Sequence, residues 1–404
     1  MKKNLTLAVL FSYSFFGFTQ TEDARFAEFE VVYSALPWVN VAGGVDQGFV
    51  YIDNLDITAT LNFSHLFKWD ERLLLFVYGL GNHGGKATAL MGDFQVASNI
   101  EAPKSWRLFE IWIQQNFFND RVSVLSGLYD LNSEFDVLSP GLLFINSSFG
   151  IGAEYAQSGV SGPSIFPVSS LGMRVSSVLS SRVKLKLAIL DGVPGDPNRL
   201  ASNEVILRRS EGALFAFESS YHFKNIEKSV RDRQYVTRRK KVGREHATSA
   251  DDKINFGAWY YSAAQTSLTD SLSSRGNWGA YVGIQNYWLR ADESYVSCFA
   301  RFGVANDNFN RFGSAISGGL VYSGLSKKRE DHLGVAFSSG VNGKSYRRLY
   351  MPHTRVETVL ECTYDIHLRK WLMVQPDIQY VINPNTEQGL SNPLGISALI
   401  QISL

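Results

Sequence analysis

The amino-acid sequence predicts an all-β protein whose strands close into a transmembrane antiparallel β-barrel. Three observations predict this fold: an N-terminal segment typical of export, long stretches of alternating polarity, and a mean hydropathy near zero. Of the 404 residues, 45% are hydrophobic, yet the mean hydropathy is −0.08. In a barrel wall only every second residue faces lipid, so the average stays low. The composition excludes a helical membrane protein, which needs several apolar runs of about 20 residues.

The first element in chain order is a secretory signal peptide, predicted over residues 1–19. Lys2 and Lys3 precede a mostly apolar run over residues 5–18, and Gly17-Phe18-Thr19 provides a small-x-small cleavage site. A basic n-region, an apolar h-region and small residues at the cleavage site are the parts of such a peptide. We therefore expect the chain to be exported, and we expect residues 20–404 to form a single barrel domain.

The strands are predicted by apolar residues that recur at every second position. Leu360 and Cys362, for example, share one parity, while Glu357 and Glu361 share the other. Such stretches run about 8 to 12 residues, which suits tilted membrane strands better than soluble ones. A soluble β-sandwich also alternates, because its outer face is wet, so the pattern alone leaves that fold open. The clearest stretches are 55–63, 183–189, 277–285, 297–304, 355–366, 374–383 and 396–404.

The cysteine and aromatic residues fit the same fold. Cys298 and Cys362 lie far apart in the sequence on apolar strand faces, so we expect free thiols and no disulfide. Large aromatic side chains near the predicted strand ends suit the girdles that barrels form at the two lipid–water interfaces. These aromatics are Trp69, Trp106, Trp259, Tyr260, Tyr261, Trp288 and Trp371.

One segment interrupts the strand pattern. Residues 224–244 hold nine Lys or Arg against two acids, and we interpret residues 224–246 as a basic loop or turn inserted between strands. A solvated loop accounts for this composition, and contact with anionic lipid headgroups is the sharper alternative. The net charge of the whole chain is +1, and no nucleic-acid partner is expected for an exported chain.

None of the motifs for catalysis, cofactor binding or metal binding occurs with the surrounding sequence that its function needs. Residues 79–84 match G-x-G-x-x-G, but a dinucleotide site needs a βαβ unit, and the surroundings here are period-two strands. The seven histidines are scattered, without H-x-H or H-E-x-x-H spacing, and the sequence contains no G-x-S-x-G. We therefore expect no enzyme activity, no cofactor and no metal site.

Eight short motifs lie in order along nearly the whole expected mature chain. They include GLYDLNSEFD at residues 127–136 and AILDGVPGDPN at residues 188–198; the others lie at 92–103, 107–115, 144–152, 162–167, 357–361 and 375–384. Together these motifs resemble the carbohydrate-selective porins of the OprB type. The resemblance implies a 16-stranded barrel in the outer membrane of a Gram-negative bacterium, through which sugars diffuse passively. It also implies the partners: small sugars, outer-membrane lipid and lipopolysaccharide, the barrel-assembly machinery during insertion, and a monomeric or homotrimeric assembly.

A porin passes a solute through weak, repeated contacts that permit exit as well as entry. We expect the polar, charged and aromatic side chains of the inward parity to make these contacts, because carboxylates, amides and guanidinium groups replace a sugar's lost hydration. Residues 130–136 reach the constriction if the segment after their strand folds inward. The candidate channel-lining residues are Glu110, Trp112, Gln114, Asp130, Asn132, Glu134, Asp136, Lys184, Lys186, Arg301, Arg355, Glu357, Glu361, Asp365, Gln375, Asp377 and Gln379.

Two alternatives stand beside a passive, sugar-preferring porin. A general or ion-conducting porin would pass sugars and non-sugars of similar size equally. An exported soluble β-sandwich that binds glycans would bury its apolar faces between two sheets and would be recovered without detergent.

Overall fold

The computed structural model describes residues 26–64, 72–196, 205–224, 252–269, 273–289, 294–326 and 330–404. The predicted signal peptide at residues 1–19, Trp69 and, apart from Lys224, the basic segment 224–246 lie outside these described residues. Within them, no helix is both long and apolar enough to span a bilayer.

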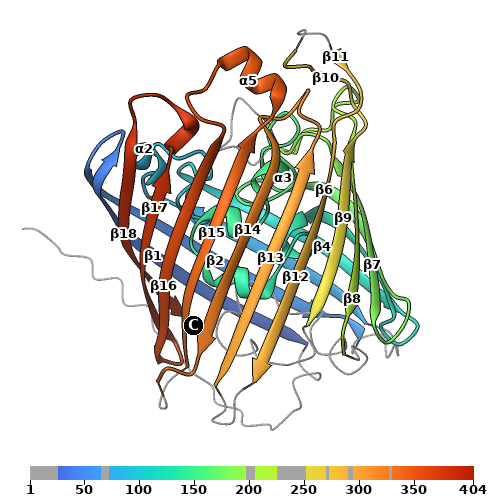
Figure 1. Cartoon of the computed structure of the whole chain (residues 1–404). Coiled ribbons are helices and arrows are strands. Elements are labelled where there is room, and N and C mark those ends of the chain that lie inside the picture. The colour runs from blue at the N-terminus through green and yellow to red at the C-terminus, as the bar shows by residue number, and fades with distance from the viewer. Residues whose placement is uncertain are drawn as a thin grey trace, which may run out of the picture.

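Sixteen of the described strands form one closed, antiparallel barrel (Figure 1). The barrel strands pair in chain order, and β1 closes the ring by pairing with β18, with Val32 opposite Ser403. Closure satisfies the backbone N–H and C=O groups of all strands inside the wall, which lipid cannot do. The predicted barrel is therefore confirmed, and the β-sandwich alternative is not favoured.

The barrel strands vary from 8 residues in β5 to 18 in β1. The short strands β10 (Gln265–Thr266) and β11 (Ser273–Ser274) form a separate two-stranded sheet. The barrel strands are β1 (Ala27–Gly44), β2 (Gly48–Asn62), β3 (Leu73–Asn82), β4 (Ser105–Phe117), β5 (Val122–Tyr129), β6 (Ser170–Val178), β7 (Val183–Asp191), β8 (Ala213–His222), β9 (Lys253–Tyr261), β12 (Trp278–Leu289), β13 (Tyr295–Ala305), β14 (Phe312–Ser323), β15 (Asp331–Asn342), β16 (Val356–Arg369), β17 (Leu372–Ile382) and β18 (Ser391–Ser403).

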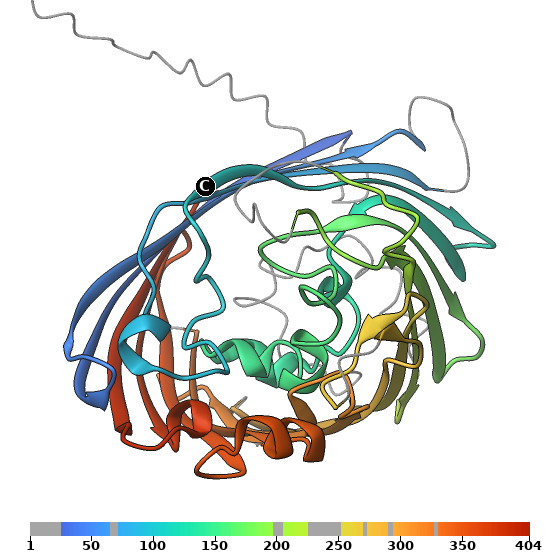
Figure 2. The same cartoon turned by 90° about the horizontal axis from the view of Figure 1, so that it is seen from above.

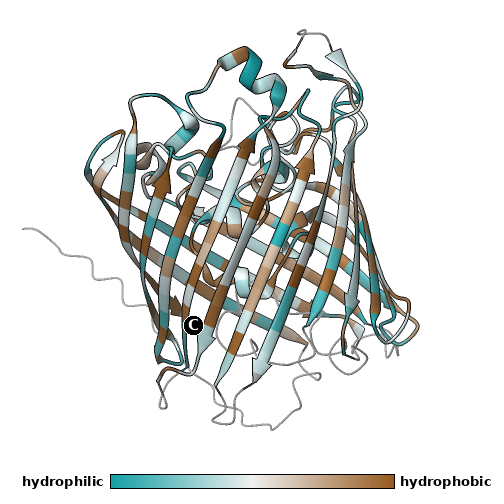
Figure 3. Ribbon diagram, in the orientation of Figure 1, coloured by the Kyte–Doolittle hydropathy of each residue, from teal (hydrophilic) through white to brown (hydrophobic). Residues whose placement is uncertain are grey.

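The wall has an apolar outer face and a largely polar inner face. Hydrophobic and hydrophilic residues alternate along the strands in Figure 3. On β16, Glu357 and Glu361 are buried in the interior, whereas Leu360 and Cys362 are exposed on the outside. Both Cys298 and Cys362 are free thiols, as predicted. The outer face of a barrel in a membrane meets lipid, so this apolar exposure is what the fold requires.

Two connections fold back into the interior, from the end of the barrel opposite the C-terminus (Figures 1 and 2). The first inward segment, residues 83–104, follows β3 and contains α2 (Thr88–Met91). The second inward segment, residues 130–169, follows β5 and contains η2 (Leu131–Ser133), η3 (Ser139–Leu143), η4 (Ser147–Phe149) and α3 (Ala153–Ala156). At the same end lie α5 (Lys344–Tyr350) and η6 (Pro384–Thr386).

The second inward segment packs against one side of the wall through aromatic side chains. Tyr155 stacks on Trp259 of β9, with ring centroids 5.1 Å apart and planes 7° apart. Phe144 and Phe149 both contact Phe299 of β13. The interior is therefore an apolar core on this side, and Figure 2 shows the green helical turns lying against the orange and red strands.

Four of the six girdle candidates within the described residues are exposed, and two are buried. Trp259 and Tyr261 point into the interior and are 2% and 1% exposed, because alternation sends only the middle residue of that aromatic run, Tyr260, outward. Tyr260 and three of the predicted tryptophans are exposed, the last of them, Trp371, in the turn between β16 and β17. These three are Trp106, Trp288 and Trp371.

Candidate functional site

A cavity of about 630 Å³ lies between the inward segments and the opposite part of the wall. Its strand-borne lining comes from β1 to β5, from β7 to β9, and from β17 and β18. The inward segments close its remaining side, with Val96, Asn99 and Ser147 among their contributions. The cavity thus lies between the two inward segments and the strands that line it.

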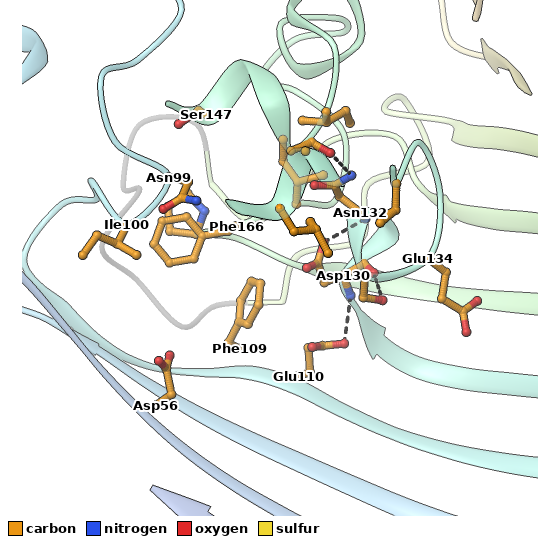
Figure 4. A pocket seen from close by; sticks show the side chains of 18 of the residues that line it. Asp56, Asn99, Ile100, Phe109, Glu110, Asp130, Asn132, Glu134, Ser147 and Phe166 are labelled. Carbon is orange, nitrogen blue, oxygen red and sulfur yellow. Dashed lines mark hydrogen bonds between the residues drawn. The ribbon is translucent and has the colours of Figure 1, made fainter. Parts of the chain in front are cut away.

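Nine of the residues predicted to line a channel line this cavity. Figure 4 shows Glu110, Asp130, Asn132 and Glu134 around it, with Asn99 and Ser147 across from them. The second inward segment folds into the barrel, which was the condition for Asp130 and its neighbours to reach the cavity. Contact of these side chains with a solute stays a prediction. The nine residues are Glu110, Trp112, Gln114, Asp130, Asn132, Glu134, Lys184, Lys186 and Gln375.

The carboxylate of Glu110 is held in place by two donors. Its Oε2 accepts a hydrogen bond from Trp112 Nε1 at 3.1 Å and another from the backbone N–H of Asp130 at 3.1 Å. A register shift in the β3–β4 pairing lies beside it, where Tyr78 faces Glu110 and Gly79 faces Leu108. This bulge turns an extra residue inward, as β-bulges do, so that a carboxylate and an aromatic ring stand side by side at the cavity.

Three cations surround Glu134 at the same cavity. The guanidinium of Arg174 lies 2.7 Å from its carboxylate, and Lys184 and Lys186 lie nearby. Burial alone would raise the pKa of Glu134, but the attraction of Arg174, Lys184 and Lys186 outweighs it and lowers the pKa. Lys186 in turn lies 2.7 Å from Glu218. Opposite charges are thus paired beside the cavity.

Sequence reasoning missed an aromatic group on β3 and β4 that lines the same cavity. Phe76 stacks with Trp112 at a centroid distance of 4.9 Å, and Tyr78 meets Phe109 edge to face at 5.1 Å. Phe166 of the second inward segment packs beside Phe109 at 6.1 Å. The stretch at residues 73–78 is apolar at both parities, so alternation gave no sign of which rings face inward.

Arg301, Asp136 and Glu154 form a buried ion triad away from the cavity. The Nη2 atom of Arg301 lies 2.8 Å from Asp136 and 2.6 Å from Glu154. Both acids belong to the second inward segment, so the triad ties that segment to β13. Gly152 and Gly303 leave room for it, since a Cβ at either position would collide with Arg301 or Glu154. Asp136 and Arg301, predicted to line the channel, instead hold the segment that shapes it.

Two glutamates of β16 accept hydrogen bonds from the backbone of the inward segments. The carboxylate of Glu357 receives the N–H groups of Phe94 and Gln95. The carboxylate of Glu361 receives two consecutive N–H groups of the second inward segment. Each glutamate is nearly inaccessible, at 0% and 3% exposure. Both face the interior as predicted, but among the described residues they contact protein backbone and lie outside the cavity lining.

The last four candidates also lie outside the cavity lining. Asp365 pairs with His332 at 2.7 Å on the inner face, and Gln379 donates from Nε2 to the Ala97 carbonyl at 3.0 Å. Asp377 is buried beside Gln379, at 3.3 Å. Arg355 precedes β16 and is exposed, because the strand that would orient it inward begins one residue later. Within the described residues, no group of three His, Cys, Asp or Glu could hold a metal ion.

Comparisons with known proteins agree with the geometry. Residues 46–402 match the family model for the carbohydrate-selective porin, OprB family. Porin B of Pseudomonas aeruginosa is 20% identical over 419 residues, covering 93% of this chain and 87% of that protein.

The fold has solved counterparts. The high-pH structure of Pseudomonas putida OprB superposes with a TM-score of 0.78 at 19% identity, covering 94% of both chains. The low-pH structure gives a TM-score of 0.56 at 16% identity, covering 94% of this chain and 92% of that one. With a closed barrel, two segments folded into its interior and a family match over residues 46–402, the chain belongs to the OprB family of carbohydrate-selective porins, which are outer-membrane channels and not enzymes.

Proposed function

We propose that small carbohydrates diffuse passively across the outer membrane through the cavity between the inward segments and the β1–β9 side of the barrel. The observation that carries this proposal is the lining around Glu110, where carboxylates and amides stand beside stacked aromatic rings. Polar groups replace the hydrogen bonds a sugar loses with water, and an aromatic face accepts the apolar face of the sugar ring. Such contacts are individually weak, which lets the solute leave as well as enter.

Several finer features belong to the same proposal. Residues 1–19 act as a signal peptide, and residues 20–404 form the mature barrel domain with a basic insertion at 224–246. Insertion uses the barrel-assembly machinery, and the outer face contacts lipid and lipopolysaccharide, which the exposed apolar side chains on the strands support. The assembly is a monomer or a homotrimer.

Liposome swelling tests the proposal directly. Purified protein is reconstituted, and swelling is followed in isosmotic glucose and in a non-sugar solute of similar size, with protein-free liposomes as the control. We expect faster swelling in glucose than in the matched non-sugar. Equal rates would favour a general or ion-conducting porin, and no swelling above the control would refute the proposal.

A further inference from the structure

The two inward segments are joined to each other by backbone hydrogen bonds. The N–H of Asn99 donates to the Ile145 carbonyl at 2.8 Å, and the N–H of Ser147 donates to the Val96 carbonyl at 3.1 Å. Val96, Asn99 and Ser147 line the cavity. The joined segments therefore form one side of the passage, and their distance from the β1–β4 side determines its bore.

The first inward segment is fixed to β16 by one carboxylate. Glu357 accepts the N–H of Phe94 at 2.9 Å and the N–H of Gln95 at 3.0 Å. The same carboxylate accepts the N–H of Asn385 at 2.5 Å, which comes from the β17–β18 connection. A single buried side chain thus joins the strand, the first inward segment and a rim loop.

The second inward segment is fixed in the same way, four residues further along the same strand. The Oε1 atom of Glu361 accepts the N–H of Ile145 at 2.5 Å, and its Oε2 atom accepts the N–H of Asn146 at 3.0 Å. Asn146 also donates from its side chain to Gln379 at 3.2 Å. The residues fixed here adjoin Ser147, which lines the cavity.

A carboxylate suits this role for a chemical reason. A carboxyl group has two oxygens that can accept, and in Glu361 each oxygen receives one of two consecutive N–H groups. A glutamine at the same position has one acceptor oxygen and one NH2 group. The NH2 group would face a backbone N–H that also donates, so that hydrogen bond would be lost. Losing a hydrogen bond to a charged group shifts the balance between a held and a displaced segment by roughly tenfold to a hundredfold.

We propose that Glu357 and Glu361 are positioning residues that set the bore of the passage, and with it the largest sugar that crosses. Within the described residues neither side chain lines the cavity, so each acts through the segment it holds. The link from bore to sugar size rests on the proposed function, whereas the bore itself can be measured with ions and inert polymers.

The test compares Glu357→Gln and Glu361→Gln with the unmodified protein. The first readout is the ratio of disaccharide to monosaccharide swelling rates, which does not depend on how many channels insert. The second is single-channel salt current with polyethylene glycols of graded size, which reports the bore of inserted barrels only. We expect each variant to raise the ratio severalfold, and to admit larger polymers with a larger and noisier current.

Asp331 provides a matched control. It begins β15 and also accepts a backbone N–H, that of Ser326 at 2.9 Å, but at the other end of the barrel. Asp331→Asn is expected to leave both readouts unchanged, and Glu361→Asp, which keeps two acceptor oxygens, is expected to fall between Glu361→Gln and the unmodified protein. Unchanged polymer exclusion in both inserted Gln variants would overturn the assignment. Failure of the unmodified protein to admit monosaccharides would refute the proposed function, while polymer exclusion would still decide the positioning role.

Discussion

The side of the barrel interior that faces the cavity (the open side) and the side that the inward segments cover (the covered side) carry similar side chains in different roles. On β4, Glu110 and Gln114 face the cavity, and Glu110 also accepts the N–H of Asp130, where the second inward segment begins. On β13 and β16, Arg301, Glu357 and Glu361 face equally inward but bind the inward segments. The strand periodicity is the same on both sides, and the difference is whether a segment covers them. Alternation therefore tells which residues face the interior, and loop placement decides which of these face a solute.

The covered side combines the charges with an apolar core. Phe144 and Phe149 pack on Phe299, and Phe144 directly precedes Ile145, whose N–H Glu361 accepts. Removing one partner of a buried charge pair leaves the other uncompensated, which is costly. On the open side the same groups stay next to the cavity, where lost contacts are replaced by water. Substitutions on the covered side should accordingly change stability and bore, and those on the open side should change affinity for the solute.

The largest effect is expected from Arg301→Ala on the covered side. It leaves Asp136 and Glu154 buried without their cation, which costs about 3–5 kcal/mol, and releases the second inward segment from β13. Urea unfolding of the refolded protein in detergent micelles measures this loss. Arg369→Ala, at the exposed end of β16, is the control and should stay within about 0.5 kcal/mol of the unmodified protein. Equal unfolding midpoints for the two variants would remove the distinction between the sides.

The sequence was sufficient for the barrel and for the inward parity of most candidates, because period-two alternation is a local property of each strand. The sequence did not predict which inward residues line the cavity and which bind the inward segments. The contacts of Glu361 with residues 145 and 146 span more than half of the chain, and nothing local to β16 marks them. Phe76 was missed for the opposite reason, since its stretch is apolar at both parities.

A second prediction concerns Asp93, beside the glutamate that holds the first inward segment. Burial, followed by the nearby charges of Glu357 and Glu101, raises its pKa well above the ordinary 3.8. A raised folded-state pKa means that Asp93 ionises more easily in the unfolded chain. Its contribution to stability is therefore fully present below its ordinary pKa and is lost as pH rises toward the folded-state value.

Asp93→Asn removes this ionisation. The variant should be more stable than the unmodified protein at neutral pH, by about 1.4 kcal/mol for each unit by which the folded pKa is raised. Urea midpoints measured from about pH 4 to about pH 8 should fall less steeply in the variant. If the urea midpoints of the two proteins changed with pH in parallel, ionisation of Asp93 would not destabilise the folded protein.

A third, smaller effect is expected from Glu110→Gln on the open side. The change weakens one hydrogen-bonding position at the cavity, so the sugar concentration that halves the ion current should rise about threefold to tenfold. Polymer exclusion should change less than in Glu361→Gln, because Glu110 accepts a single N–H at the start of the second inward segment, whereas Glu361 accepts two within it. A changed bore in Glu110→Gln with unaltered sugar block would reverse the assignment of the two sides.

The smallest effect is expected at Cys362, the residue that follows Glu361. Glu361 faces inward and Cys362 outward, so Cys362→Ser, which adds no charge, should change stability by less than the roughly 2–4 kcal/mol that a Lys or Arg costs on the lipid face at the bilayer midplane. In a Cys298→Ser background, Cys362 should react in proteoliposomes with a lipid-soluble maleimide and resist a charged, water-soluble one. A shift of register by one residue would exchange the positions of Glu361 and Cys362. Rapid reaction with the charged reagent would therefore place Cys362 in the interior, and would contradict both the anchor at Glu361 and the parity on which the two sides are compared.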